Sequence, residues 1–448
     1  MKLYYQPSDR PKFGQMIVFA IQQLLAIMAA TLVVPVIVGN GMSPAAALFG
    51  AGIGTIVYVL FTKMKSPVFL GSSFAFLGSM AAAFAGAAST AVGYLGLILG
   101  AIFAGLVYVL IAILVKIIGV DWLNKLMPAV VIGPTVAIIG LSLAGNAVGD
   151  MQSSGTGTAN TNLCILCGIV TLFVTILCST FGKKMARLIP FILGILAGYA
   201  FAAVFTVVGI ASGNEALKVI NFSVFSSLVE GGVGLHTFFA VPEFTFLTAL
   251  GGFSEITGNY IGTIAVAYIP VAFVVFAEHV ADHKNISSII EHDLLEDPGL
   301  SRTLLGDGVG SMVGAFFGGC PNTTYGESIA CVAITGNASV ATIITTAVGA
   351  IIISFFSPFV AFVNSIPSCV MGGVCVALYG FIAVSGLKMI QKVDLEDNRN
   401  LFVVSTILVC GIGGLAVTFG KVTITAIATA LILGIIVNQM LGAKKNKQ

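Results

Sequence analysis

Long apolar runs alternate with short polar connections along almost the whole chain. A helix needs about 20 apolar residues to cross a bilayer. Runs of this kind occupy 15–37, 44–62, 68–86, 91–117, 124–147, 161–182 and 187–212, and then 260–283, 302–319, 322–336, 340–363, 369–387, 400–419 and 422–441. The pattern predicts an all-α polytopic membrane protein with fourteen transmembrane segments in two groups of seven.

The same segments give the expected organisation of the chain. We predict a cytoplasmic N-terminus at 1–14, a first seven-span repeat at 15–212, an extracellular connector at 213–259, a second seven-span repeat at 260–441 and a cytoplasmic tail at 442–448.

Composition supports a membrane protein. Hydrophobic residues make up 58% of the 448 residues and charged residues only 8%, against roughly a quarter charged in soluble domains. Cys164 and Cys167 form a CxxC motif, but they lie inside a predicted span without a soluble redox domain. We therefore expect neither a disulfide framework nor a metal or redox site there.

Lysine and arginine positions test the number of spans, because short cytoplasmic loops collect positive charge. With the N-terminus inside, the predicted cytoplasmic segments contain Lys2, Arg10, Lys12, Lys63, Lys65, Lys116, Lys125, Lys183, Lys184, Arg187, Lys284, Arg302, Lys388, Lys392, Arg399, Lys444, Lys445 and Lys447. Only Lys218 and Lys421 fall outside. The bias predicts an even number of spans in the plasma membrane, with both termini cytoplasmic.

Two groups of seven imply an inverted repeat, because seven is odd and the second group enters the membrane from the opposite side. Inverted repeats are typical of secondary transporters, whose substrate site lies at mid-membrane between broken helices. The third span of each group contains a proline, Pro67 or Pro321, that interrupts a helix. Each proline is followed by two hydroxyl residues and an aromatic: Ser72, Ser73 and Phe74 in one group, Thr323, Thr324 and Tyr325 in the other. We predict a broken helix in both spans.

Four acidic residues lie in or at the margins of predicted spans: Glu278, Asp282, Asp307 and Glu327. Each costs several kcal/mol to bury unless it is protonated, paired or solvated by a cavity. No lysine or arginine is predicted at a matching depth, so proton or substrate handling is the favoured interpretation.

Glu278 and Asp282 are one helical turn apart on the same face. Two adjacent carboxyls resist simultaneous ionisation, so one of them is expected to hold a proton near neutral pH, as a proton-coupled carrier requires. For Asp282 a structural alternative remains, in which it is solvated or bonds to His279 or His283. No metal site is expected at these histidines and His292.

Glu327 begins the second half of the broken span, where the helix dipole favours negative charge. The alternative is that it only caps its own helix. Free N–H groups at Phe74 and Gly326 are donors, while Glu278 and Glu327 are acceptors. Together they suit a planar ligand with amide N–H and C=O groups, and the ring of Phe74 or Tyr325 would contact it.

Two further assignments concern neighbouring polar residues. We place Ser73 among the candidate substrate-binding residues, because it belongs to the hydroxyl pair of the first broken span. Asp307 lies among glycines in the ninth span. It is either a hydrogen-bond partner behind the site that takes part in proton coupling, or a structural residue.

Four motifs resemble the nucleobase-ascorbate transporter family, and most of all its bacterial uracil permeases. They are "AEHV" at 277–280, "DLLEDPGL" at 293–300, "PNTTYGE" at 321–327 and "LGSSFAF" at 70–76. The resemblance implies a core domain of spans 1–4 and 8–11 (15–117 and 260–363) and a gate domain of spans 5–7 and 12–14 (124–212 and 369–441). It also implies short antiparallel strands in spans 3 and 10.

The resemblance further implies the roles of individual residues. Glu278 would be the main uracil-binding acid and Glu327 the second, while the N–H groups of Phe74 and Gly326 would bind ring carbonyls. The expected activity is proton symport of a nucleobase without a cofactor, with sodium as an alternative coupling ion. Expected partners are the nucleobase, protons, membrane lipid and a second copy of the chain in a homodimer, but not nucleic acid.

Two departures from the family pattern leave the substrate open. Asp282 replaces the histidine of the uracil permeases and is more typical of purine transporters, whereas Ser328 and Ala330 depart from the usual signature after the second acid. We favour uracil, with xanthine or another purine as the alternative. An anion transporter is a weaker alternative, because Glu278 and Glu327 would repel an anion. No catalytic serine triad or HExxH motif occurs, so we do not expect an enzyme.

Overall fold

The computed structural model describes residues 3–119, 122, 126–155, 158–183, 185–419 and 422–443. Seven lysines used in the charge count lie outside the described residues: Lys2, Lys125, Lys184, Lys421, Lys444, Lys445 and Lys447. Parts of the predicted cytoplasmic ends, 1–14 and 442–448, lie outside them too.

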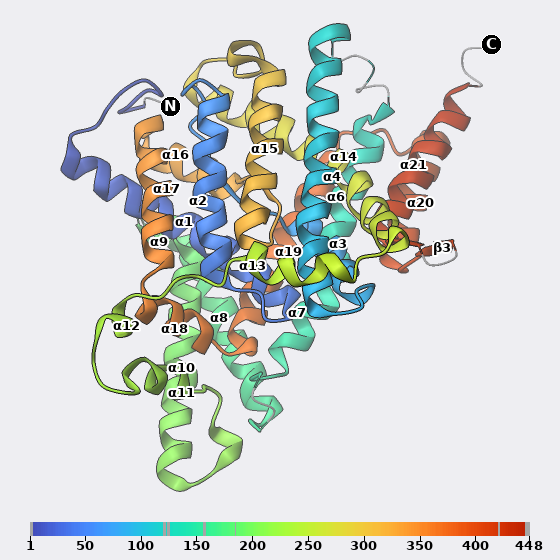
Figure 1. The fold of residues 1–448 in the computed structure, drawn as a ribbon. Helices are drawn as coiled ribbons and strands as arrows, with labels where there is room; N and C mark the ends of the chain where they lie inside the picture. Colours follow the sequence, from blue (N-terminus) through green and yellow to red (C-terminus); the bar gives the residue numbers. More distant parts are fainter. Residues whose placement is uncertain are drawn as a thin grey trace.

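All fourteen predicted segments correspond to helices (Figure 1). The first group contains α1 (Phe13–Val38), α2 (Pro44–Phe61), α3 (Leu77–Ala85), α4 (Thr90–Ile118), α6 (Ala129–Ser142) with α7 (Ala144–Met151), α8 (Thr161–Phe181) and α10 (Pro190–Ser212). The second contains α14 (Gly258–Ile290), α15 (Leu300–Gly318), α16 (Gly326–Thr335), α17 (Val340–Ser354), α19 (Ser368–Ile390), α20 (Asn398–Ile412) and α21 (Ala426–Ala443). The prediction of a helical protein with two seven-segment repeats is confirmed.

Both third spans are broken as predicted. Each consists of a short strand followed by a short helix: β1 (Leu70–Ser72) precedes η1 (Phe74–Phe76) and α3, and β2 (Asn322–Thr324) precedes α16. The strands pair antiparallel, with Leu70 opposite Thr324 and Ser72 opposite Asn322. Because the strands satisfy each other's backbone groups, extended chain is tolerated inside the bundle.

Two predicted spans are each divided into two helices. The interval 340–363 contains α17 and a separate α18 (Ser357–Ser365), which has a proline in its first turn. The interval 124–147 contains α6 and then α7, joined at Leu143.

The prediction that 400–419 forms a single helix is wrong. Helix α20 ends at Ile412, after which β3 (Val417–Phe419) pairs with β4 (Val422–Ile424). Gly414 has a φ of 74° that ends helical geometry. Hydropathy does not separate a short apolar strand from the end of a helix.

Glycines allow the closest helix contacts. Helix α15 packs on α2 and α4, and α17 also packs on α2. A Cβ atom at Gly50 would lie 2.4 Å from the carbonyl oxygen of Gly314, and one at Gly54 would lie 2.7 Å from that of Gly310. Small residues therefore bring the backbones of α2 and α15 together, as in other membrane bundles.

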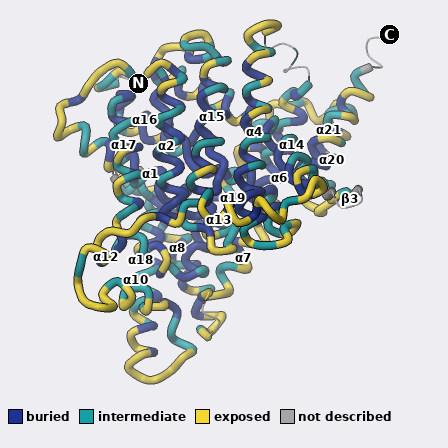
Figure 2. The backbone as a smooth tube through the Cα atoms, viewed as in Figure 1, coloured by how far each residue is buried: buried dark blue, intermediate teal, exposed yellow. Residues whose placement is uncertain are grey.

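A second group of contacts joins α19 to α6 and α8, and α20 to α21 and α6. Buried residues follow the interior of the bundle, whereas the segment of α11 (Ser223–Ser226) and α12 (Leu235–Phe238) is largely exposed (Figure 2). The division into core and gate remains a prediction.

Candidate substrate site

A cavity of about 430 Å³ lies where the two broken spans meet. One wall comes from η1, α14 and α16, and the opposite wall comes from α6, α10 and α19. Glu278, Asp282 and Glu327 all line it. The fold therefore brings together three of the four intramembrane acids that the sequence singles out.

Glu278 and Asp282 project from α14 into this cavity. Glu278 is exposed to it and Asp282 is partly exposed. The Thr324 hydroxyl donates a 2.7 Å hydrogen bond to Asp282 Oδ2. Asp282 thus bonds neither His279 nor His283, and its partner is one of the hydroxyl residues of the broken span.

The uncapped starts of two short helices also reach the cavity. η1 begins at Phe74 and α16 at Gly326, and neither has a side-chain cap. Both residues line the cavity. Because the first N–H groups of a helix have no partner within it, they are available to a ligand carbonyl. Open space surrounds the Cα of Gly326, where an added Cβ would meet no atom within 4 Å.

Tyr325 lines the cavity but has a second role that the sequence did not indicate. Its hydroxyl donates a 2.7 Å hydrogen bond to the carbonyl oxygen of Ser72. A Cβ at Gly71 would lie 2.3 Å from the Tyr325 ring, so the ring lies directly against the backbone of β1. Tyr325 therefore connects the two broken spans through both its hydroxyl group and its ring.

Ser73 does not line the cavity, contrary to its predicted place there. Its backbone N–H donates to the carbonyl oxygen of Pro321 at 2.9 Å, and its hydroxyl is buried. Ser73 thus extends the pairing of β1 with β2.

Ser328 follows the second acid and is fully buried. Its hydroxyl accepts hydrogen bonds from Gln23 on α1 and, at 3.0 Å, from the Phe69 backbone N–H. This residue, which departs from the family signature, connects α1 to both broken spans.

Asp307 lies behind the cavity wall and is fully buried. Its Oδ2 atom is 2.7 Å from His279 Nδ1, and His279 Nε2 is 3.0 Å from the Thr303 hydroxyl. His283 Nε2 is 2.6 Å from the Tyr58 hydroxyl. Both histidines therefore form hydrogen bonds to groups inside the bundle, and neither faces the acids that line the cavity.

Arg187 lines the cavity, although the sequence did not indicate that it belongs to the site. It belongs to α9 (Met185–Leu188) and lines the cavity with an exposed side chain. Its charge indicated a cytoplasmic loop, and no local signal shows that this loop folds against α1 and α16. Within the described ranges, no group of three or more histidine, cysteine or acidic side chains gathers into a metal site.

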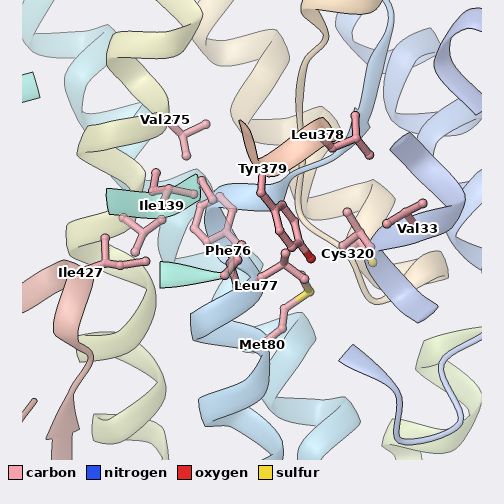
Figure 3. Close-up of a cluster of buried hydrophobic side chains, with 14 of the residues drawn as sticks. Val33, Phe76, Leu77, Met80, Ile139, Val275, Cys320, Leu378, Tyr379 and Ile427 are labelled. Carbon is pink, nitrogen blue, oxygen red and sulfur yellow. The ribbon is translucent and has the colours of Figure 1, made fainter. Parts of the chain in front are cut away.

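Buried apolar side chains pack at one end of the cavity lining, beside Leu378 (Figure 3). Phe76 stacks on Tyr268 with ring centroids 5.5 Å apart, and Phe74 contacts Tyr379 edge to face at 6.2 Å. Leu77, Met80 and Ile427 belong to the same buried cluster. Toward the opposite end, the lining continues to Ile334, Ser385 and Met389, near the C-terminal ends of α16 and α19.

Comparisons with known proteins agree with this architecture. The uracil permease of Bacillus caldolyticus is 38% identical over 97% of this chain and 94% of its own. That of Bacillus subtilis is 38% identical over 98% of this chain and 95% of its own. The transmembrane domain of a cyanobacterial bicarbonate transporter has the same fold, with a TM-score of 0.63 and 13% identity over 96% of this chain and 98% of that domain.

The match to a family model covers residues 14–420, which include the first repeat, the second repeat up to β3, the paired strands β1 and β2, and every residue that lines the cavity. The chain is therefore a multi-pass membrane protein that belongs to the Permease family.

Proposed function

We propose that this protein imports uracil together with a proton. The observation that carries the proposal is a cavity that combines facing carboxyls with uncapped helix starts, in a chain 38% identical to two uracil permeases. Membership in a family of permeases supports transport of a small molecule in preference to catalysis.

The cavity offers the hydrogen-bonding groups that a uracil ring requires. Glu278 and Glu327 accept from ring N–H groups, while the backbone N–H groups of Phe74 and Gly326 donate to ring carbonyls. Phe74 supplies an aromatic edge beside the ring. Every polar edge of the ring then has a partner, which offsets the cost of removing it from water.

Proton coupling follows from three carboxyls in one small cavity. Three neighbouring carboxylates repel one another, so a proton on one of them stabilises the substrate-bound form. Release of that proton to the cytoplasm restores the repulsion and weakens binding of the substrate. Asp307, which is bonded to His279 outside the cavity lining, is a candidate for modulating this release of the proton. No cofactor is required, and sodium remains the alternative coupling ion.

The cavity faces the cytoplasm in the orientation that the positive charges predict. In that orientation, the C-terminal ends of α16 and α19 and the start of α10 lie inside, and the Phe76 cluster closes the outer side. Transport then requires movement of the core against the gate, so that the cluster opens while the inner end closes. We place the protein in the plasma membrane, with both termini cytoplasmic and a homodimer as the expected assembly.

Xanthine or another purine is the second candidate substrate, because Asp282 stands where uracil permeases carry histidine. An anion substrate is disfavoured although a bicarbonate transporter shares the fold. Three carboxyls in the cavity repel an anion more strongly than two helix starts attract it.

The test is uptake of radiolabelled uracil and xanthine into right-side-out membrane vesicles, with and without an inward proton gradient. We expect uracil uptake that follows the gradient and is not inhibited by excess xanthine. Xanthine uptake would favour the second candidate. Gradient-independent uptake, or bicarbonate flux without uracil uptake, would refute the proposal.

A further inference from the structure

The start of α16 carries two groups of the proposed site, and no side-chain cap holds it in place. Gly326 and Glu327 are the first two residues of this helix, and both line the cavity. Tyr325, the residue before them, forms no capping hydrogen bond with its side chain. In the described part of the chain, no salt bridge fixes Glu327. Because an uncapped helix end frays easily, the position of the Glu327 carboxyl depends on contacts from other segments.

Gln23 of α1 supplies such a contact. Its side chain is only 3% exposed. Its Nε2 atom donates to the hydroxyl oxygen of Ser328 and, at 3.3 Å, to the Ser328 carbonyl oxygen. Ser328 is fully buried and directly follows Glu327, which is partly exposed in the cavity. Farther along α1, Ala26 lines the cavity and packs against Cys331 of α16. One side-chain amide of α1 thus holds the residue next to the carboxyl.

The chain just before β1 holds the same turn from another side. The Phe69 N–H group donates to the Ser328 hydroxyl oxygen at 3.0 Å, and the Phe69 carbonyl oxygen accepts from the Tyr325 N–H group at 3.2 Å. These two bonds do not involve Gln23. Removal of the Gln23 amide should therefore leave the crossing of the broken spans intact and change only how firmly the first turn of α16 is held.

We propose that Gln23 is a positioning residue for substrate binding, which acts through Ser328 to hold the Glu327 carboxyl where it accepts from a ring N–H group. This inference rests on the proposed binding of uracil. Gln23 itself lies outside the cavity lining, so its effect on the ring is transmitted by α16. A hydrogen bond weakens steeply as its angle departs from linearity, so a small shift of the first turn is enough to weaken the bond that Glu327 makes.

The expected effect is a part of what the carboxyl contributes. Polar contacts between membrane helices change an equilibrium by a factor of roughly three to twenty. Gln23→Met keeps the length of the side chain and removes its amide, so it should weaken uracil binding by roughly this factor. Gln22→Met is the matched control. Gln22 is the adjacent glutamine of α1, lies outside the cavity lining and is rotated about 100° around the helix axis. It should bind uracil as the wild-type protein does.

The experiment consists of two double-variant cycles, with the Kd of purified protein for uracil as the readout. Gln23→Met is combined with Glu327→Ala in one cycle and with Glu278→Ala in the other. Because Gln23 acts through Glu327, its effect should largely disappear when that carboxyl is absent and should persist when Glu278 is absent. A residue that only stabilised the fold would weaken binding by the same factor in both backgrounds.

Ser328→Ala removes the same contact from its other partner and is tested in the same two cycles, so the test remains available if Gln23→Met does not fold. Melting temperatures of all variants show which of them are folded. A wild-type Kd in both Gln23→Met and Ser328→Ala overturns the inference, as does an equal effect in the two backgrounds. If the wild-type protein binds no uracil, the proposed function itself fails. Wild-type binding with additive cycles refutes only the positioning role of Gln23.

Discussion

The crossing of the two broken spans leaves no space for a side chain at Gly71, and this gives a sharp prediction. A Cβ atom there would lie 2.3 Å from both Cε2 and Cζ of Tyr325. The ring is only 4% exposed, and its hydroxyl is held by the carbonyl oxygen of Ser72. Gly71→Ala must therefore displace Tyr325, and with it the start of α16 at Gly326.

The magnitude follows from two costs. Overpacking a rigid site costs roughly 1–3 kcal/mol, and loss of the Tyr325 hydrogen bond costs roughly 0.5–1.5 kcal/mol. We expect Gly71→Ala to destabilise the protein by roughly 2–4 kcal/mol on these grounds. Uracil affinity should also fall by at least tenfold, because Gly326 and Glu327 directly follow Tyr325.

The assay measures the apparent melting temperature in detergent and the Kd for uracil on the same samples. Gly78→Ala is the control, because its Cβ would meet only Ile427, at 4.0 Å. The double variant Gly71→Ala/Tyr325→Ala should be less destabilised than the sum of its two single variants, since removal of the ring relieves the clash. Wild-type melting temperature and Kd in Gly71→Ala would show that the crossing is not rigid, and the reasoning would be wrong.

Three further predictions test other parts of the structure. Glu278→Gln should weaken uracil binding roughly ten- to a hundredfold, the usual worth of a hydrogen bond to a charged group, and an unchanged Kd in a binding assay would contradict its assigned role. Cys331 is only 2% exposed and packs with Ala26 and Ile189, so a membrane-permeant maleimide should label it slowly in the native protein and rapidly after denaturation, and fast native labelling that is lost in Cys331→Ala would contradict this packing. The hydrogen bond from Lys65 lowers the pKa of Asp297, so any stability that this pair contributes is present above the unfolded pKa of Asp297 and is lost as the pH falls through its lower folded value. Because both side chains are substantially exposed, Asp297→Asn should leave melting temperature and uptake near wild type at pH 7, and a large loss of either would contradict a surface role.

Much of the architecture could be predicted from local sequence. The length of each apolar run sets the number of crossings, because an unpaired backbone group or a charge in lipid costs several kcal/mol. Pro67 and Pro321 predicted the breaks, because proline interrupts helical hydrogen bonding wherever it occurs within a helix. Glu278, Asp282 and Glu327 were singled out because carboxyls in apolar spans require a special environment.

Other features depend on contacts between segments far apart in the chain. Ser328 bonds to Gln23, some 305 residues away, and Tyr325 bonds to Ser72 at a separation of 253 residues. The apolar run at 400–419 was predicted as one helix, although it ends in a strand. Hydropathy measures how apolar a segment is, and it does not indicate which backbone hydrogen bonds the segment makes.

The sequence by itself determined what kind of protein this is: how many apolar segments the chain contains, where two of them break, and which acids lie within them. Only the tertiary structure decided which of these groups share one cavity. Packing placed Asp307 beside His279 outside the cavity lining, and it placed Arg187, from a connecting loop, in that lining. The reason is physical, because burial and helix breaking act on each segment separately, whereas distances between side chains are set by how the segments pack.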